Sequence, residues 1–229
     1  MKRWIDDLIS IFFPPVCHVC GNRIEGGPRF VCPQCMETLP RTFFHLDDFN
    51  PMVRRLAGKV RFERATGVYF YSRNSGISSF VQDFKYRNFP SLAVYAGRMM
   101  YSELYMSGFF SGIDFLVPVP LHPLKKLKRG YSQTELICKG ISRESGIPVS
   151  NRLRARRHRT QTGLSHDERA TNVSGVFRMR KGTDLVGKHI LLVDDICTTG
   201  ATISAAVSAI SEEYPAAEIS ILTYGVTPE

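Results

Sequence analysis

The segment HILLVDDICTTGAT, residues 189–202, constrains the fold of this chain more than any other stretch. Four apolar residues, 190–193, run directly into two acids, Asp194 and Asp195. A short continuous apolar run is typical of a strand buried on both faces of a parallel sheet. From residue 202 onward, apolar residues recur at the three- and four-residue steps of one helix face. The segment therefore predicts a strand, an acidic pair, a tight loop and a helix.

The loop of this unit is suited to binding a phosphate group. Open α/β sheets bind ligands at the carboxyl ends of their strands, and the N–H groups at a helix N-terminus favour an anion. A glycine permits close backbone approach, and threonines add hydroxyl donors. We expect a phosphate monoester in the loop and a diol or a metal ion beside the acids, which together describe a phosphorylated sugar. The loop residues are Thr198, Thr199, Gly200, Ala201 and Thr202.

Two alternative interpretations fit parts of the segment. A strand that ends in acids also occurs in P-loop NTPases, and residues 182–188 match the spacing of a phosphate-binding loop. However, position 189 is His where Ser or Thr should hold magnesium, and the match leads into a strand instead of a helix. The second alternative is a structural turn in which Thr199 or Thr202 only caps the helix. The complete acid, threonine and glycine string favours a binding site.

The string ILLVDDICTTGAT resembles the signature of type I phosphoribosyltransferases, which bind 5-phosphoribosyl-1-pyrophosphate (PRPP). This resemblance implies that Asp194 and Asp195 lie at the ribose hydroxyls near Mg²⁺. It also implies that residues 198–202 surround the 5′-phosphate. We expect Cys197 to contribute only its backbone, because no histidine at a defined spacing indicates an activated thiolate.

Two Cys-x-x-Cys pairs lie near the N-terminus, separated by eleven residues. Four thiolates at this spacing match structural zinc sites with tetrahedral geometry. Two disulfides, or a site that has lost its metal, are the alternatives, and disulfides are disfavoured in a chain without an export signal. The candidate ligands are Cys17, Cys20, Cys32 and Cys35.

Length and composition allow one α/β domain with a small appendage in 229 residues. No apolar stretch approaches the roughly eighteen residues of a membrane span. Asp6 and Asp7 interrupt the apolar region that a signal peptide would need, so we expect a cytoplasmic protein. The apolar residues around this acidic pair instead share one face of an amphipathic helix.

Strands that alternate with helices predict an α/β fold with a mostly parallel sheet flanked by helices. We expect residues 1–48 to hold the amphipathic helix and the zinc-binding subdomain, and residues 49–229 to form a phosphoribosyltransferase-like domain. The expected strands are 65–71, 115–120, 190–193 and 218–224, and the expected helices are 77–86, 91–107, 132–145 and one from 202.

The order of the motifs resembles one branch of this superfamily, the competence protein F (ComF) family. The motifs are the cysteine pairs, FKYRNFP, VPVPLHPLKKLKRGYSQTELI, RHRTQTGLSHDERATNVSGVF and the PRPP string, and they span roughly residues 12–224. The resemblance implies a link to DNA uptake in natural transformation, beside a helicase-like partner. It does not name the acceptor of the phosphoribosyl group.

A short basic loop follows the strand expected at 115–120. Its residues Lys125, Lys128, Arg129 and Gly130 are placed to meet the pyrophosphate of PRPP, with the glycine permitting close backbone approach. A solvated basic turn is the alternative, because single surface cations are common.

A second basic segment, residues 152–169, carries five arginines within eight positions. Mutual repulsion and the scarcity of apolar anchors predict a mobile loop. As an active-site lid, it would bring Arg157, Thr160 or Gln161 to the pyrophosphate, and we count Arg157 and Gln161 with the two acids as catalytic candidates. A nucleic-acid arm and an idle solvated loop are the alternatives.

The sequence thus predicts transfer of a phosphoribosyl group from PRPP to an unknown acceptor, with release of pyrophosphate and help from Mg²⁺. The net charge of +9 supports an alternative. In that alternative, the chain is a non-catalytic DNA-uptake accessory that binds single-stranded DNA or a helicase partner, and its PRPP site is vestigial or sensory.

Overall fold

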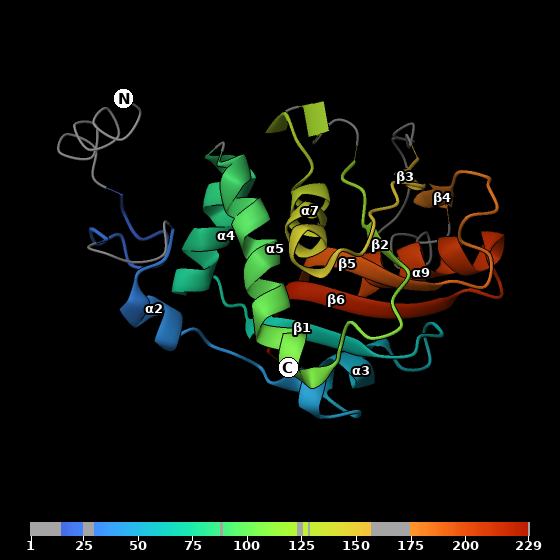
Figure 1. Ribbon diagram of the computed structural model, residues 1–229, viewed down its shortest axis with the longest axis horizontal. Coiled ribbons are helices and arrows are strands. Elements are labelled where there is room, and N and C mark those ends of the chain that lie inside the picture. Colours follow the sequence, from blue (N-terminus) through green and yellow to red (C-terminus); the bar gives the residue numbers. More distant parts are fainter. Residues whose placement is uncertain are drawn as a thin grey trace, which may run out of the picture.

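The computed structural model describes residues 15–24, 30–87, 89–122, 126–127, 129–156 and 175–228. Its centre is a parallel sheet with the strand order β1-β6-β5-β2 (Figure 1). The strands are β1 (Ala65–Phe70), β2 (Phe115–Pro118), β5 (His189–Cys197) and β6 (Glu218–Val226). A short antiparallel pair, β3 (Leu153–Ala155) and β4 (Phe177–Met179), lies outside this sheet. The predicted parallel α/β sheet is confirmed.

Helices cover both faces of the sheet. The described helices are α2 (Pro33–Glu37), α3 (Pro51–Leu56), α4 (Gly76–Tyr86), α5 (Pro90–Leu104), α7 (Gln133–Ser145) and α9 (Ala201–Glu213), with 3-10 turns η1 (Phe44–Leu46) and η2 (Tyr105–Ser107). Figure 1 shows α4, α5 and α7 together over one face, and α3 on the other side. The apolar faces expected for α4 and α9 are both buried.

Strand β5 separates two hydrophobic cores. Its residues Leu191 and Val193 pack in the core that contains α4, α5 and α7. Its residues Ile190 and Leu192 pack in the core that contains α3 and α9. Because successive side chains of a strand point to opposite faces, an uninterrupted apolar run is what such a position requires.

The ends of the central strands differ from the prediction. Strand β5 continues to Cys197, because Asp194, Ile196 and Cys197 are in register with residues of β6. Strand β2 instead ends at Pro118, two residues short of its expected end. The acids therefore belong to the strand itself, just past the point where β2 stops.

The N-terminal residues that the structure describes pack against the main fold. Cys17, Val31, Cys32 and Leu39 lie in the same core as α4 and α5. The amphipathic helix expected before residue 15 lies outside the described residues, and the division at residue 48 stays a prediction. Within the described ranges, no helix has both the length and the apolar character required to cross a membrane.

Helices α5 and α7 cross at a pair of glycines. A Cβ atom added to Gly97 would collide with the carbonyl oxygen of Ile137, and one added to Gly140 with that of Val94. Close approach of the two backbones positions α7 against α5, and the first residues of α7 form one wall of the site described below.

We expect Gly97→Ala to lower the free energy of unfolding by about 2–3 kcal/mol, because the helices must separate to admit the methyl group. Ser102→Ala, at an exposed position of the same helix, should change it by less than about 0.5 kcal/mol. Urea denaturation measures both. A stabilised Gly97→Ala variant, as helix propensity alone predicts, would show that the crossing tolerates a side chain.

Candidate functional site

The unequal lengths of β2 and β5 open a site at the carboxyl edge of the sheet. The N–H of Val119 donates to the carbonyl of Val193 at 2.9 Å, after which β5 continues along β6. A cavity of about 380 Å³ lies here. Its lining includes Lys85, Tyr86, Pro120, His122, Arg129, Gln133, Asp194, Asp195 and Thr202. Residues from four separate segments thus meet at the acidic pair.

Asp194 is the more buried of the two acids, with 8% of its surface exposed. Burial, followed by the negative charge of Asp195, raises the pKa of Asp194 to about 8. The N–H of Asp195 donates to Oδ1 of Asp194 at 2.8 Å, which opposes this shift. Near neutral pH the free site therefore favours a protonated Asp194.

Asp195 is paired with a cation from α4. Its Oδ2 lies 2.8 Å from Nζ of Lys85, and both side chains are largely buried. Lysine is rarely buried without a partner, so this contact fixes the side chain at the cavity wall. The sequence analysis missed Lys85 as a site residue. The available signal was its position in the FKYRNFP motif, but no spacing rule relates that motif to β5.

The predicted phosphate loop is an exposed turn that leads into α9. Gly200 is the N-cap, with a left-handed φ of 81°, and no side chain of its own caps the helix. An added Cβ there would lie 2.7 Å from Leu56. Thr198, Thr199, Ala201 and Thr202 are exposed to solvent.

The capping interpretation of this loop is wrong for Thr202, because the N-cap is Gly200. Among the described residues, the side chain of Thr199 makes one 3.4 Å contact, in which its Oγ1 accepts from the N–H of Ala201. Helix α9 thus begins without a strong side-chain cap, and the N–H groups of its first turn can serve an anion.

Two cations outside the predicted set hold the carbonyl groups of the loop. Arg55 of α3 donates to the carbonyl oxygen of Thr198 at 2.6 Å and to that of Thr227 at 2.8 Å. Nζ of Lys59 lies 3.4 Å from the carbonyl oxygen of Thr199. Because a trans peptide directs its C=O and N–H to opposite sides, these bonds help to orient the loop amides.

The opposite wall of the cavity is built by Arg129, Gln133 and Tyr86. Arg129 donates to Oε1 of Gln133 at 3.2 Å and to the hydroxyl of Tyr86 at 3.1 Å, and its guanidinium stacks over the Tyr86 ring. A guanidinium can only donate, so the amide oxygen of Gln133 must face it. Gln133 is only 2% exposed, and its Nε2 has no acceptor among the described residues.

Gln133 therefore places a buried amide nitrogen without an acceptor at the cavity lining, at the start of α7, where the helix dipole also favours an anion. The sequence analysis included Arg129 but missed Gln133 and Tyr86. Gly130, which was predicted with Arg129, has a left-handed φ of 78° and lines a neighbouring cavity of about 460 Å³.

The structure brings Asp194, Asp195, Arg129 and Thr202 to one cavity. Residues 198–201 are described and lie in the turn before Thr202, but they do not line this cavity, and Gly130 lines the neighbouring one. The remaining predicted contacts lie outside the described residues: Lys125, Lys128, Arg157, Thr160 and Gln161.

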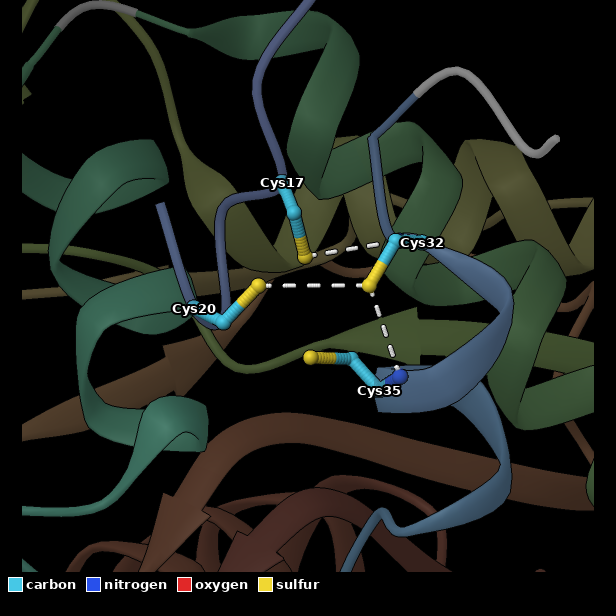
Figure 2. Close-up of side chains that lie close together, drawn as sticks. All are labelled: Cys17, Cys20, Cys32 and Cys35. Carbon is cyan, nitrogen blue, oxygen red and sulfur yellow. Dashed lines mark hydrogen bonds between the residues drawn. The ribbon is translucent and has the colours of Figure 1, made fainter. Parts of the chain in front are cut away.

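The four candidate metal ligands come together at a second site (Figure 2). The sulfur atoms of Cys17, Cys20, Cys32 and Cys35 all lie within 4.8 Å of one another, and all four cysteines are free thiols. Four sulfurs placed 2.3 Å from a tetrahedral zinc ion would be about 3.8 Å apart. The donor set therefore fits zinc.

Backbone N–H groups also stabilise the thiolate form of one cysteine in this cluster. The N–H of Cys32 donates to Sγ of Cys17 at 3.3 Å. Burial acts to raise the pKa of Cys17, but N–H donation from Cys32, Cys20 and Val19 outweighs it and lowers the pKa to about 7. Burial and the neighbouring thiols raise the pKa of Cys35. A bound cation would favour the thiolate form of each.

Comparisons with known proteins show which proteins this chain resembles. The phosphoribosyl transferase domain model matches residues 135–224. The DNA utilization protein YhgH of Escherichia coli K12 is 29% identical over 194 residues, 82% of this chain and 81% of the relative. The competence protein ComFC of Bacillus subtilis is 24% identical over 212 residues, 91% and 82% of the two chains. The chain is therefore similar to phosphoribosyltransferase-like proteins of the ComF family.

Another relative is competence protein F of Haemophilus influenzae, which is 33% identical over 94 residues, 40% of this chain and 41% of the relative. Among solved structures, the chain is similar to glutamine PRPP amidotransferase from B. subtilis. The identity is 20% and the TM-score 0.42, over 61% of this chain and 30% of that one.

Proposed function

We propose that the chain binds PRPP in the cavity beside β5 and transfers its phosphoribosyl group to an acceptor, with release of pyrophosphate. The observation that carries this proposal is the convergence of the acidic pair, the start of α9 and the start of α7 on one region. A sugar that bears a phosphate at one end and a diphosphate at the other needs two anion sites flanking a diol site.

The 5′-phosphate would bind at residues 198–202, where the first N–H groups of α9 and the exposed hydroxyls converge. The ribose hydroxyls would bind to Asp194 and Asp195. The same carboxylates suit Mg²⁺, a hard cation that prefers oxygen ligands. When bound, Mg²⁺ would supply positive charge to the pyrophosphate.

The pyrophosphate would bind at the start of α7. Arg129 supplies a charged donor, and Gln133 supplies the N–H groups that lack a protein acceptor. We extend this role to Lys125, Lys128, Arg157 and Gln161 on the resemblance alone.

The reaction breaks the bond between C1 of the ribose and the pyrophosphate oxygen, which keeps the electron pair. An electron pair of the acceptor forms the new bond to C1. Positive charge develops on the ribose as the bond breaks, and the Asp195 carboxylate would stabilise that charge, joined by Asp194 once a bound cation favours its ionised form.

We also propose that the four cysteines hold zinc with a structural role. A closed set of four thiolates leaves no coordination position for water, so the metal would hold the N-terminal segment together.

The biological setting we propose is DNA uptake, with a cytoplasmic location and a helicase-like partner. Relatives of this chain are named as competence and DNA utilization proteins. The net charge of +9 supports the alternative function, in which the chain is a non-catalytic accessory that binds single-stranded DNA and its PRPP site is vestigial or sensory.

Calorimetry with PRPP and Mg²⁺ tests the function directly. The parent protein is expected to bind PRPP, and to bind ribose 5-phosphate more weakly because that ligand lacks the pyrophosphate. A screen of bases and amines for pyrophosphate release would then identify the acceptor. Folded protein that binds single-stranded DNA but gives no heat with PRPP would favour the accessory alternative.

Gln133→Leu separates the two halves of the site. Loss of hydrogen bonds to a charged ligand should weaken PRPP binding about 10- to 100-fold. The affinity for ribose 5-phosphate should stay within about twofold, because that ligand has no pyrophosphate for Gln133 to contact. An equal loss for both ligands would contradict the placement of pyrophosphate at α7.

A further inference from the structure

Helix α4 connects the cysteine cluster with the acidic pair. The four cysteines and the residues between them, 17–20 and 32–35, are called the cysteine knuckle below. In Figure 1, α4 is the helix of its layer nearest to the N-terminal segment that carries the knuckle. One side of α4 contacts the cysteine knuckle, and the other side contacts the cavity.

On the knuckle side, the contact is a buried hydrogen bond between His18 and Asp83. Nδ1 of His18 lies 2.6 Å from Oδ2 of Asp83, and the two side chains are 10% and 9% exposed. The first residue of α4, Gly76, also packs so closely on Val19 that an added Cβ would collide with it. Since His18 and Val19 lie between two candidate ligands, metal binding would fix both contacts.

On the cavity side, the last turn of α4 carries Lys85, which pairs with Asp195 at 2.8 Å. Residues 83 and 85 are separated by about 200° around the helix axis, so they face opposite sides. The carbonyl of Phe84 also accepts from the hydroxyl of Tyr131 at 2.6 Å, just before α7. One turn of α4 thus contacts the knuckle, the acidic pair and the segment that leads into α7.

We propose that the cysteine knuckle, through the His18–Asp83 hydrogen bond, positions Lys85 at Asp195, so that metal occupancy of the knuckle sets the affinity of the cavity for PRPP. This inference rests on the proposed function. His18 is a positioning residue in this scheme, because its ring contacts Asp83 and the edge of Phe89 instead of the cavity. Release of the metal frees the backbone on both sides of His18 and loosens the last turn of α4.

The test compares two substitutions at His18 in full-length, zinc-loaded protein. His18→Leu removes the donor to Asp83, whereas His18→Asn places an amide N–H donor where Nδ1 lies. With zinc content unchanged, PRPP affinity is expected to fall about 10-fold in the first variant and to stay within about threefold of the parent in the second. Arg87→Gln is the matched control. It removes the exposed partner of Asp83 and should leave affinity within about twofold.

A double-mutant cycle shows whether His18 acts through Lys85. Lys85→Met alone should weaken PRPP binding, and adding His18→Leu should cost little more, because the residue that it positions is gone. Fully additive losses would contradict the inference and indicate a general structural role for His18.

Hydrogen exchange tests the same link without PRPP. Amides in the last turn of α4 should exchange faster in His18→Leu and in chelated protein than in the parent, and His18→Asn should restore protection. If the parent failed to bind PRPP, the proposed function would be wrong. Hydrogen exchange would still show whether the knuckle stabilises the last turn of α4. Unchanged exchange in His18→Leu and in chelated protein would overturn the inference.

Discussion

Replacing both acids, in Asp194→Asn/Asp195→Asn, is expected to weaken PRPP binding at least about 100-fold while the protein stays folded. Each carboxylate that accepts from a ribose hydroxyl contributes a charge-assisted hydrogen bond worth about 1.5–3 kcal/mol, and two are lost together. Asparagine keeps the shape of each side chain. Calorimetry with PRPP and Mg²⁺ measures the loss, and metal analysis should show the zinc content unchanged.

The pH dependence of the free energy of unfolding provides a control that the acidic substitutions leave the protein folded. The raised pKa of Asp194, about 8, means that the folded protein binds more protons than the unfolded chain between about pH 4 and pH 8. The free energy of unfolding should therefore fall as pH rises through this window, by at most about 1.4 kcal/mol per pH unit. Asp194→Asn should flatten this decline and raise stability at pH 8.

Urea denaturation at several pH values, from 5 to about 8, checks this expectation. A variant that is more stable at pH 8 but no longer binds PRPP would locate the defect in the site and not in the fold. Parent-like PRPP affinity in the folded double variant would falsify the assignment of the acids.

The central strand was predictable because its signal is local. Residues 190–193 are apolar without interruption, and both faces of β5 are indeed buried. Its end was not predictable, because acids are disfavoured in strands and the sequence alone does not show that Thr223 and Gly225 of β6 lie beside Asp194 and Ile196. Pairing with β6 extends the strand through them.

The site residues also fall into a group that could be predicted from the sequence and a group that could not. The loop 198–202 and the acids before it are contiguous, so their spacing carried the prediction. Lys85, Arg55 and Gln133 reach the site from α4, α3 and α7, far from β5 in the sequence. Single lysines, arginines and glutamines on helices are usually solvated, so only the packed fold distinguishes these three.

Freshly purified, reduced and unchelated protein is expected to carry about one zinc ion per chain, because four thiolates converge on one position. Cys32→Ser should reduce the bound zinc to near zero. Cys138→Ala is the matched control, since Cys138 is a buried thiol outside the cluster, and its zinc content should stay near that of the parent.

Zinc loss should also destabilise the fold beyond the knuckle. Cys17, Val31 and Cys32 contribute to the core that contains α4 and α5, so release of this segment exposes apolar surface of both helices. Chelation should therefore lower the midpoint of thermal unfolding and increase the binding of a hydrophobic dye. If reduced, unchelated protein contained no zinc, or if Cys32→Ser retained the full amount, the four cysteines would not be the metal site.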